Sequence, residues 1–212
     1  MSITTIFKRP ILGSRAFWLR QTRLWHWISA AICLVGMILF AVTGITLNHA
    51  SQIESRPQVV VRDGRVPAAL LGEIKLQQGP AKRPLPPALR TWIADALAVQ
   101  VGDREAEWSQ EIYVSLPRPG GDAWLSIDLA SGDARYEQTD RGWIAYFNDL
   151  HKGRHAGAAW SLFLDFFSGA CVVFCATGLV LLQLMARQRP MTWPMVALGL
   201  VIPVLLALLF IH

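Results

Sequence analysis

Five histidines carry the clearest chemical signal in this sequence: His26, His49, His151, His155 and His212. Neutral imidazole is the commonest metal ligand in proteins and a common axial ligand of haem iron. Along one helix, the spacing of His26 and His49 corresponds to about 34 Å, so these two histidines are expected at opposite faces of a membrane. His151 and His155 are four residues apart, and on a helix they share one face. We therefore expect His49, His151 and His155 at one level and His26 at the other.

Two histidines at one level can hold a haem. A six-coordinate b-type haem needs one histidine from each of two helices. His49 with His151, or His49 with His155, provides such a pair, and we expect His49 and His151 to be the iron ligands. His26 has no histidine partner at its own depth, so a haem there needs a non-histidine ligand or a second copy of the chain. The alternative is a structural role, because histidines at helix ends also lie among lipid headgroups or cap carbonyls.

Three charged residues are further candidates. Asp165 lies inside an apolar block, where a carboxylate is costly and usually faces the bundle interior with a partner. It either moves a proton or orients a ligand, or it hydrogen-bonds to Thr43, Thr46 or a backbone group. Lys152 and Arg154 are expected to meet a lipid phosphate, a haem propionate or an anionic partner.

Three long apolar blocks must position these residues. They are residues 24–47, which contain no Asp, Glu, Lys or Arg, residues 156–185, whose only charge is Asp165, and residues 192–211. About 20 apolar residues span the hydrocarbon core of a bilayer. Across all 212 residues, 53% are hydrophobic and 17% charged. The sequence therefore predicts an α-helical integral membrane protein with three transmembrane helices.

Basic residues near the helix ends predict the orientation. They are Lys8, Arg9, Arg15, Arg20 and Arg23 before the first block, and Arg187 and Arg189 between the second and third. Both flanks are expected to be cytoplasmic, which places the segment between the first two helices outside the cytoplasm. The net charge of +5 fits these flanks, and we expect no nucleic-acid partner.

The insert between the first two helices is long enough for one small domain. We expect an α+β fold, with one helix against a small antiparallel sheet. Its elements are strands at 59–61, 111–116, 124–129 and 135–137, a helix at 87–100, a loop at 79–87 and turns at 62–65, 117–122 and 131–133. The insert contains no phosphate-binding glycine loop, nucleophile elbow or cysteine cluster.

These predictions divide the chain into six parts. They are a cytoplasmic N-terminal segment (1–21), transmembrane helix 1 (22–49), the extracytoplasmic domain (50–148), transmembrane helix 2 with its outer extension (149–186), a cytoplasmic loop (187–191) and transmembrane helix 3 (192–212). All three cysteines lie in apolar blocks without a Cys-x-x-Cys pair, which argues against a disulfide scaffold or a zinc ribbon.

Four short motifs resemble one family. They are Leu24-Trp25-His26-Trp27, Thr43-Gly44-Ile45-Thr46-Leu47-Asn48-His49, Asp149-Leu150-His151-Lys152-Gly153-Arg154 and Thr177-Gly178-Leu179. With the insert, which is similar to a single PepSY module, they resemble the PepSY-associated transmembrane (PepSY-TM-like) family of bacterial inner-membrane proteins, in its short three-helix branch. The resemblance covers about residues 20–190.

The resemblance implies a periplasmic PepSY domain and, from larger members, haem b held by helix histidines. Those members pass electrons across the membrane, and some reduce ferric siderophores. By position, His26, His49 and His151 match the family's helix histidines, whereas His155 has no clear match. The chain departs from the larger reductases in having three helices instead of four or more. It also has Ser29 where a glycine usually follows the His-x-Trp start.

Two classes of function follow. The first is a haem b electron-transfer protein of the inner membrane, a possible subunit of a transmembrane ferric reductase, that serves reduction of periplasmic ferric iron or ferric siderophore. Its electrons would come from a redox partner protein or from quinol, because the sequence has no flavin or nicotinamide fingerprint. It would act alone or as a homo-oligomer. The alternative is a membrane-anchored PepSY interaction or inhibitory module, or an accessory subunit of a metal-uptake or respiratory complex, without a cofactor of its own.

Overall fold

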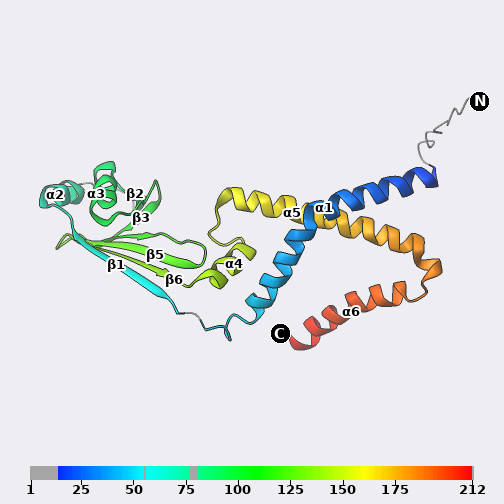
Figure 1. Cartoon of the computed structure of the whole chain (residues 1–212). Helices are drawn as coiled ribbons and strands as arrows, with labels where there is room; N and C mark the ends of the chain where they lie inside the picture. The colour runs from blue at the N-terminus through cyan, green and yellow to red at the C-terminus, as the bar shows by residue number, and fades with distance from the viewer. Residues whose placement is uncertain (1–13, 55, 77–80, 212) are drawn as a thin grey trace, which may run out of the picture. The chain divides into compact units, whose positions relative to one another are not determined.

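The computed structural model describes residues 14–54, 56–76 and 81–211 (Figure 1). The chain forms two compact units, Met1–Ile38 with Phe163–His212 and Leu39–Leu162. Lys8, Arg9 and His212, and part of the loop expected at 79–87, lie outside the described residues.

In the described part of the chain, three helices are long and apolar enough to cross a membrane, in agreement with the three predicted spans. They are α1 (Arg15–Asn48), α5 (Gly157–Met185) and α6 (Thr192–Phe210). A short 3₁₀ turn, η1 (Ala186–Gln188), follows α5 and leads to α6. In the first unit, α1 and α5 approach closely where Gly36 faces the ring of Phe167, with no room for a side chain at Gly36.

The second unit contains one six-stranded antiparallel sheet in the order β1-β6-β5-β4-β3-β2. Its strands are β1 (Gln58–Arg65), β2 (Lys82–Pro84), β3 (Glu105–Trp108), β4 (Glu111–Ser115), β5 (Gly121–Asp128) and β6 (Asp133–Asp140). β5 and β6 are consecutive in the chain and form a hairpin of two interior strands, with β1 paired to β6 on one side and β4 paired to β5 on the other.

Two helices cover one face of this sheet, α2 (Ala68–Leu76) and α3 (Pro87–Leu97) (Figure 1). Buried and exposed residues alternate along β4, as expected for a sheet with one covered face. The core contains Leu89 and Ile93 from α3 together with Leu125 and Ile127 from β5, all fully buried. The α+β class predicted for the insert is confirmed.

Several details of the insert differ from the prediction. The turn expected at 62–65 lies inside β1, because the whole of β1 pairs with β6 from Gln58↔Asp140 to Arg65↔Asp133. A second helix, α2, packs beside α3, and a short strand, β2, lies in the described part of the expected loop. The sequence also did not predict β3 or a further helix, α4 (Trp143–His151). These elements are too short to show a clear periodicity in the sequence. In the folded domain, packing against the other elements stabilises them.

The hairpin between β5 and β6 provides a pH-dependence prediction. The Oδ1 atom of Asp128 accepts backbone hydrogen bonds from Ser131 and Ala130, both at 2.7 Å, and these bonds lower the pKa of the Asp128 carboxyl. Because the folded-state pKa lies below the unfolded value of about 3.9, the stabilisation is complete above that pH and is lost as pH falls through the folded-state pKa.

We therefore expect the protection of the β5–β6 turn against hydrogen exchange, measured relative to the intrinsic exchange rate at each pH, to fall on acidification in the wild type. The Asp128→Asn variant should show a smaller acid-induced change, because its amide does not titrate in this range. Equal pH profiles for the two proteins would contradict the assignment.

Candidate functional site

Two side-chain hydrogen bonds hold α4 against the last turns of α1. The ring Nδ1 of His151 lies 2.7 Å from the hydroxyl of Thr43, and the hydroxyl of Thr46 donates to Asn148 Oδ1 at 2.8 Å. The two residues on each helix are three apart, so each pair lies on one helix face. The His151 ring also packs on Phe40, with ring centroids 4.8 Å apart. We call His151, Phe40, Thr43 and Gly44 the His151 cluster.

The hydrogen bonds of Thr43 determine the tautomer of His151. The Thr43 hydroxyl donates its only proton to a carbonyl of its own helix, that of Leu39 at 2.9 Å or Phe40 at 3.2 Å. With that proton donated to the helix, the Thr43 hydroxyl accepts from His151, and this network assigns the proton of the neutral imidazole to Nδ1. In this tautomer of the neutral ring the lone pair lies on Nε2, the nitrogen that an axial ligand presents to iron.

An equivalent arrangement occurs at His26, in the first unit. The His26 Nδ1 lies 3.0 Å from the Thr177 hydroxyl and 3.2 Å from the Phe174 carbonyl oxygen, which can only accept. The His26 ring stacks on Phe174 at 4.6 Å. The carbonyl fixes the proton on Nδ1, and Nε2 again keeps its lone pair. We call His26, Phe174, Thr177 and Gly178 the His26 cluster.

Both clusters are built on the same five-residue motif, Phe-x-x-Thr-Gly. It occurs as Phe40 to Gly44 in α1 and as Phe174 to Gly178 in α5. In each cluster the glycine lies beside the histidine ring: a Cβ at Gly44 would lie 3.7 Å from His151 Cε1, and one at Gly178 would lie 3.4 Å from His26 Cε1. Phe40 and Phe174 were not among the residues predicted from the sequence. The repeated motif is the signal by which both could have been found.

His49 is placed differently from His151. Its ring is exposed, and its Nδ1 donates to the carbonyl of Ile45 on its own helix at 3.0 Å. Thr43 and His49 are six residues apart, so their side chains point about 120° apart around the helix axis. The structure thus brings His151 onto the Thr43 face of α1 and places His49 on another face. The ligation of one iron by His49 and His151 stays a prediction.

The expectation that His151 and His155 share a helix face is wrong. α4 ends at His151, and the chain turns before α5 begins at Gly157. Gly153 and His155 both have positive φ, +65° and +57°, which interrupts the helix. The Nε2 atom of His155 accepts a hydrogen bond from Arg154 Nε at 3.1 Å, so its lone pair is already used.

The chemistry of these nitrogens fits the haem b that the sequence predicts. His26, His49 and His151 each place Nδ1 in a hydrogen bond and keep Nε2 available, as haem ligands do. Among the described residues, no group of three or more His, Cys, Asp or Glu is arranged to hold a metal ion. A haem does not require such a group, because the porphyrin supplies four of the six ligands to iron.

Asp149 connects α4 to the sheet. It is only 5% exposed, and its Oδ2 accepts from the backbone N–H of Gly120 at 2.9 Å. Its carboxylate also lies 3.3 Å from Lys152 Nζ and 4.0 Å from an Arg141 amino group. Gly120 lies in the β4–β5 turn with φ +73°, and a Cβ there would meet the backbone of Tyr146 in α4. Asp149 therefore holds the helix that carries His151 in place against the sheet.

Removing this carboxylate should loosen α4. We expect Asp149→Ala to lower the free energy of unfolding by about 2 kcal/mol, because a nearly buried charged acceptor is lost. The matched control is Asp122→Ala. The Asp122 carboxylate also pairs with Arg141, with an N–O distance of 2.6 Å, but it is exposed. Its removal should therefore change the free energy of unfolding by less than about 1 kcal/mol. Hydrogen exchange of the 117–122 segment in the full chain measures both. Equal effects would contradict the role given to Asp149.

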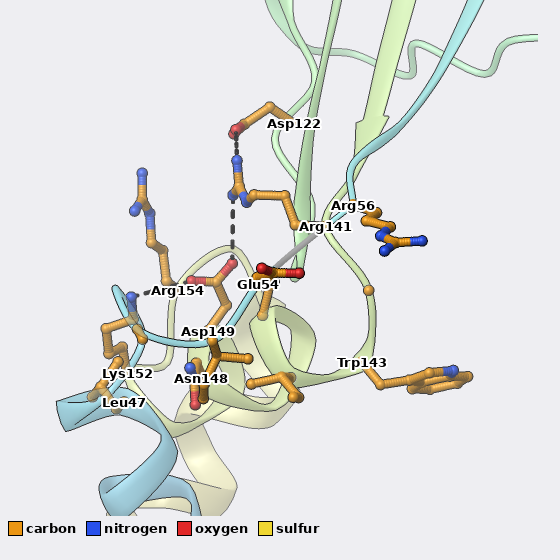
Figure 2. Close-up of a pocket in the computed structure, with 15 residues that line it drawn as sticks. Leu47, Glu54, Arg56, Asp122, Arg141, Trp143, Asn148, Asp149, Lys152 and Arg154 are labelled. Carbon is orange, nitrogen blue, oxygen red and sulfur yellow. Dashed lines mark hydrogen bonds and ion pairs between the residues drawn. The ribbon is translucent and has the colours of Figure 1, made fainter.

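The other charged candidates have separate positions. Lys152 and Arg154 line a cavity of about 710 Å³ beside α4 (Figure 2). Asp165 lies exposed on α5, and its carboxylate makes no hydrogen bond or ion pair with any other residue that the structure describes. Thr43 and Thr46, which were candidate partners for Asp165, bond to His151 and Asn148. All three cysteines, Cys33, Cys171 and Cys175, are free.

One comparison with known proteins identifies a family. A family model described as "Putative PepSY_TM-like" matches residues 17–212, which is nearly the whole chain. Comparisons with curated proteins and with solved structures found no match.

Proposed function

Because the chain belongs to the PepSY_TM-like family, we propose that it is an inner-membrane protein of bacteria that binds haem b and transfers electrons. The proposed destination of the electrons is ferric iron or a ferric siderophore in the periplasm. The proposal has the N-terminus in the cytoplasm, since Arg15, Arg20 and Arg23 lie in the first turns of α1 and basic residues favour that side. The sheet domain is then periplasmic.

The observation that carries the proposal is the state of His151. A haem ligand must be neutral and must keep one ring nitrogen unprotonated, and a second hydrogen bond usually fixes which one. Thr43 does so here, because its proton is engaged with the helix and only its lone pair remains for Nδ1. A histidine that served only to cap a helix or to contact headgroups would not need a neighbour that selects its tautomer.

Each residue of the His151 cluster has a distinct part. His151 presents Nε2, Thr43 fixes the ring and increases its basicity, and Phe40 supports one side of the ring. Gly44 leaves the space beside Cε1 open. When bound, haem b supplies one-electron redox chemistry that amino-acid side chains do not. His49 is the proposed second ligand at this level.

The His26 cluster is proposed to serve the cytoplasmic side in the same way. Its second ligand would come from a non-histidine residue or from another copy of the chain. Electrons would enter from quinol or from a redox partner protein, and the periplasmic sheet domain would dock the donor or the acceptor.

The test is a reduced-minus-oxidised absorption spectrum of the full chain, expressed with a haem supply and purified in detergent. We expect the bands of a six-coordinate b-type haem and a measurable haem content by pyridine extraction. A flat spectrum with no extractable haem would overturn the proposal. The anchored PepSY interaction module would then be the better explanation of the fold.

A further inference from the structure

A second site lies on the sheet side of α4, in the cavity of about 710 Å³ (Figure 2). This cavity is separate from the His151 cluster, none of whose residues lines it. Its walls combine the end of α1, at Leu47, with the chain that follows it and with the first turn of α4. Volumes of about 300 to 1,000 Å³ are typical of sites for small ligands.

The ion pairs around this cavity leave two cations and one acid unpaired among the described residues, an excess of one positive charge. Four basic and three acidic side chains line it. Arg141 and Lys152 are neutralised by Asp122 and Asp149. The remaining basic residues are Arg56 and Arg154, and neither forms an ion pair with any residue in the described part of the chain; nor does Glu54, the third acid. Figure 2 shows Lys152 and Arg154 on one side of the Arg141–Asp149 contact and Arg56 on the other.

Neutral hydrogen-bond donors at this cavity also favour an anion. Asn148 is 6% exposed and lines the cavity. Its Oδ1 accepts from Thr46, whereas its amide nitrogen has no hydrogen-bond partner among the described residues. The first turn of α4 also borders the cavity, and no side chain caps it. Free N–H groups at a helix N-terminus favour an anion, and the helix dipole acts in the same direction.

The apolar part of the wall indicates the kind of anion. The apolar stretch of α1 ends at Leu47, where the polar residues Asn48 and His49 follow, so the cavity begins at the level where the membrane span ends. Ile53, Trp143 and Ile144 extend the apolar surface, and Trp143 is 76% exposed. Tryptophan is typical of the headgroup level of a membrane. An anion that lies beside an apolar wall at this depth is expected to be amphiphilic.

We propose that this cavity binds the phosphate of an anionic phospholipid headgroup, with Arg56 and Arg154 as its charged contacts. A bound lipid would lie between the end of α1, the first turn of α4 and the sheet, and would tie the sheet domain to the membrane surface. The site requires no haem, so it stands whether or not the chain carries electrons.

The test measures lipid binding by the full chain in detergent, by native mass spectrometry with phosphatidylglycerol or phosphatidylcholine added. We expect a clear preference for phosphatidylglycerol. The Arg56→Ala/Arg154→Ala double variant should lose affinity for it by about thirtyfold, since two basic contacts to an anionic lipid are removed. The matched control is Lys75→Ala/Arg104→Ala, which removes the same charge from exposed positions outside the cavity and should bind as the wild type does.

Competition with inorganic phosphate distinguishes a lipid headgroup from a soluble phosphate compound as the ligand. Displacement of the lipid from the wild type by millimolar phosphate would overturn the lipid proposal in favour of a soluble phosphate compound. Retention of the lipid under these conditions supports the lipid headgroup. Equal phosphatidylglycerol affinity for the double variant and the wild type would overturn the proposal. So would equal losses in the double variant and its charge-matched control, or no retained lipid at all.

Discussion

The His151→Ala variant is expected to lose one haem per chain. The substitution removes the imidazole whose Nε2 is free and whose Nδ1 is bound to Thr43, and no neighbouring side chain in the cluster offers a replacement nitrogen. The measurement is haem per chain by pyridine extraction, together with the reduced-minus-oxidised spectrum, on variants purified from haem-supplied cells. An unchanged haem content would contradict the assignment of His151 as a ligand.

Two further variants separate ligation from packing. His155→Ala is the matched control, because its Nε2 already accepts from Arg154, and it should retain the wild-type haem content. Thr43→Val keeps the imidazole but removes its hydrogen-bond acceptor. We expect it to weaken haem binding by about tenfold or more and to shift the reduction potential, because the partner of a ligating histidine tunes its basicity. A shifted potential with haem still bound is a result that a purely structural role of Thr43 would not produce.

The second large effect is expected at Gly121, the first residue of β5. Gly121 is buried, and a Cβ added there would overlap the backbone carbonyl oxygen of Thr139 in β6. That carbonyl belongs to an interior hairpin of the sheet and cannot move away as a flexible side chain can. We expect Gly121→Ala to lower the free energy of unfolding of the sheet domain by about 3 kcal/mol.

Gly72 offers the matched control for this prediction. It lies within α2, and a Cβ there would meet nothing within 4 Å. Gly72→Ala should therefore raise stability by about 0.5 to 1 kcal/mol, since alanine favours a helix more than glycine does. Hydrogen exchange of β5 and β6 in the full chain measures both variants. Similar stabilities of the two would mean that the β5–β6 strands adjust more easily than their geometry indicates.

The extent to which the fold could be predicted differs between the two units. Apolar length is a local property, so the three spans were evident from residues 24–47, 156–185 and 192–211. The alternation in β4 and the helical spacing in α3 were also evident. β3 and α2 were not predicted, because a four-residue strand and a nine-residue helix carry too few residues for a period to show.

The length of β1 shows why tertiary structure overrides local signals. The residues Arg62 to Arg65 contain Asp-Gly and have the composition of a turn, yet they continue the strand. Their backbone groups pair with β6, and Arg62 donates to the carbonyls at the end of α3, those of Leu97 and Ala98. The turn preference is weaker than these hydrogen bonds, which form only once the sheet and α3 are in place.

The sequence by itself determined the membrane class, the family and the histidines as the residues of interest. Only the tertiary structure decided which histidines have a threonine hydroxyl beside ring Nδ1. His151 meets a threonine 108 residues away in the chain, and His26 meets one 151 residues away. Spacing along a helix cannot report such contacts. The proton on Nδ1 depends on a hydroxyl whose own hydrogen is already donated, and that is a property of the assembled helices rather than of any segment alone.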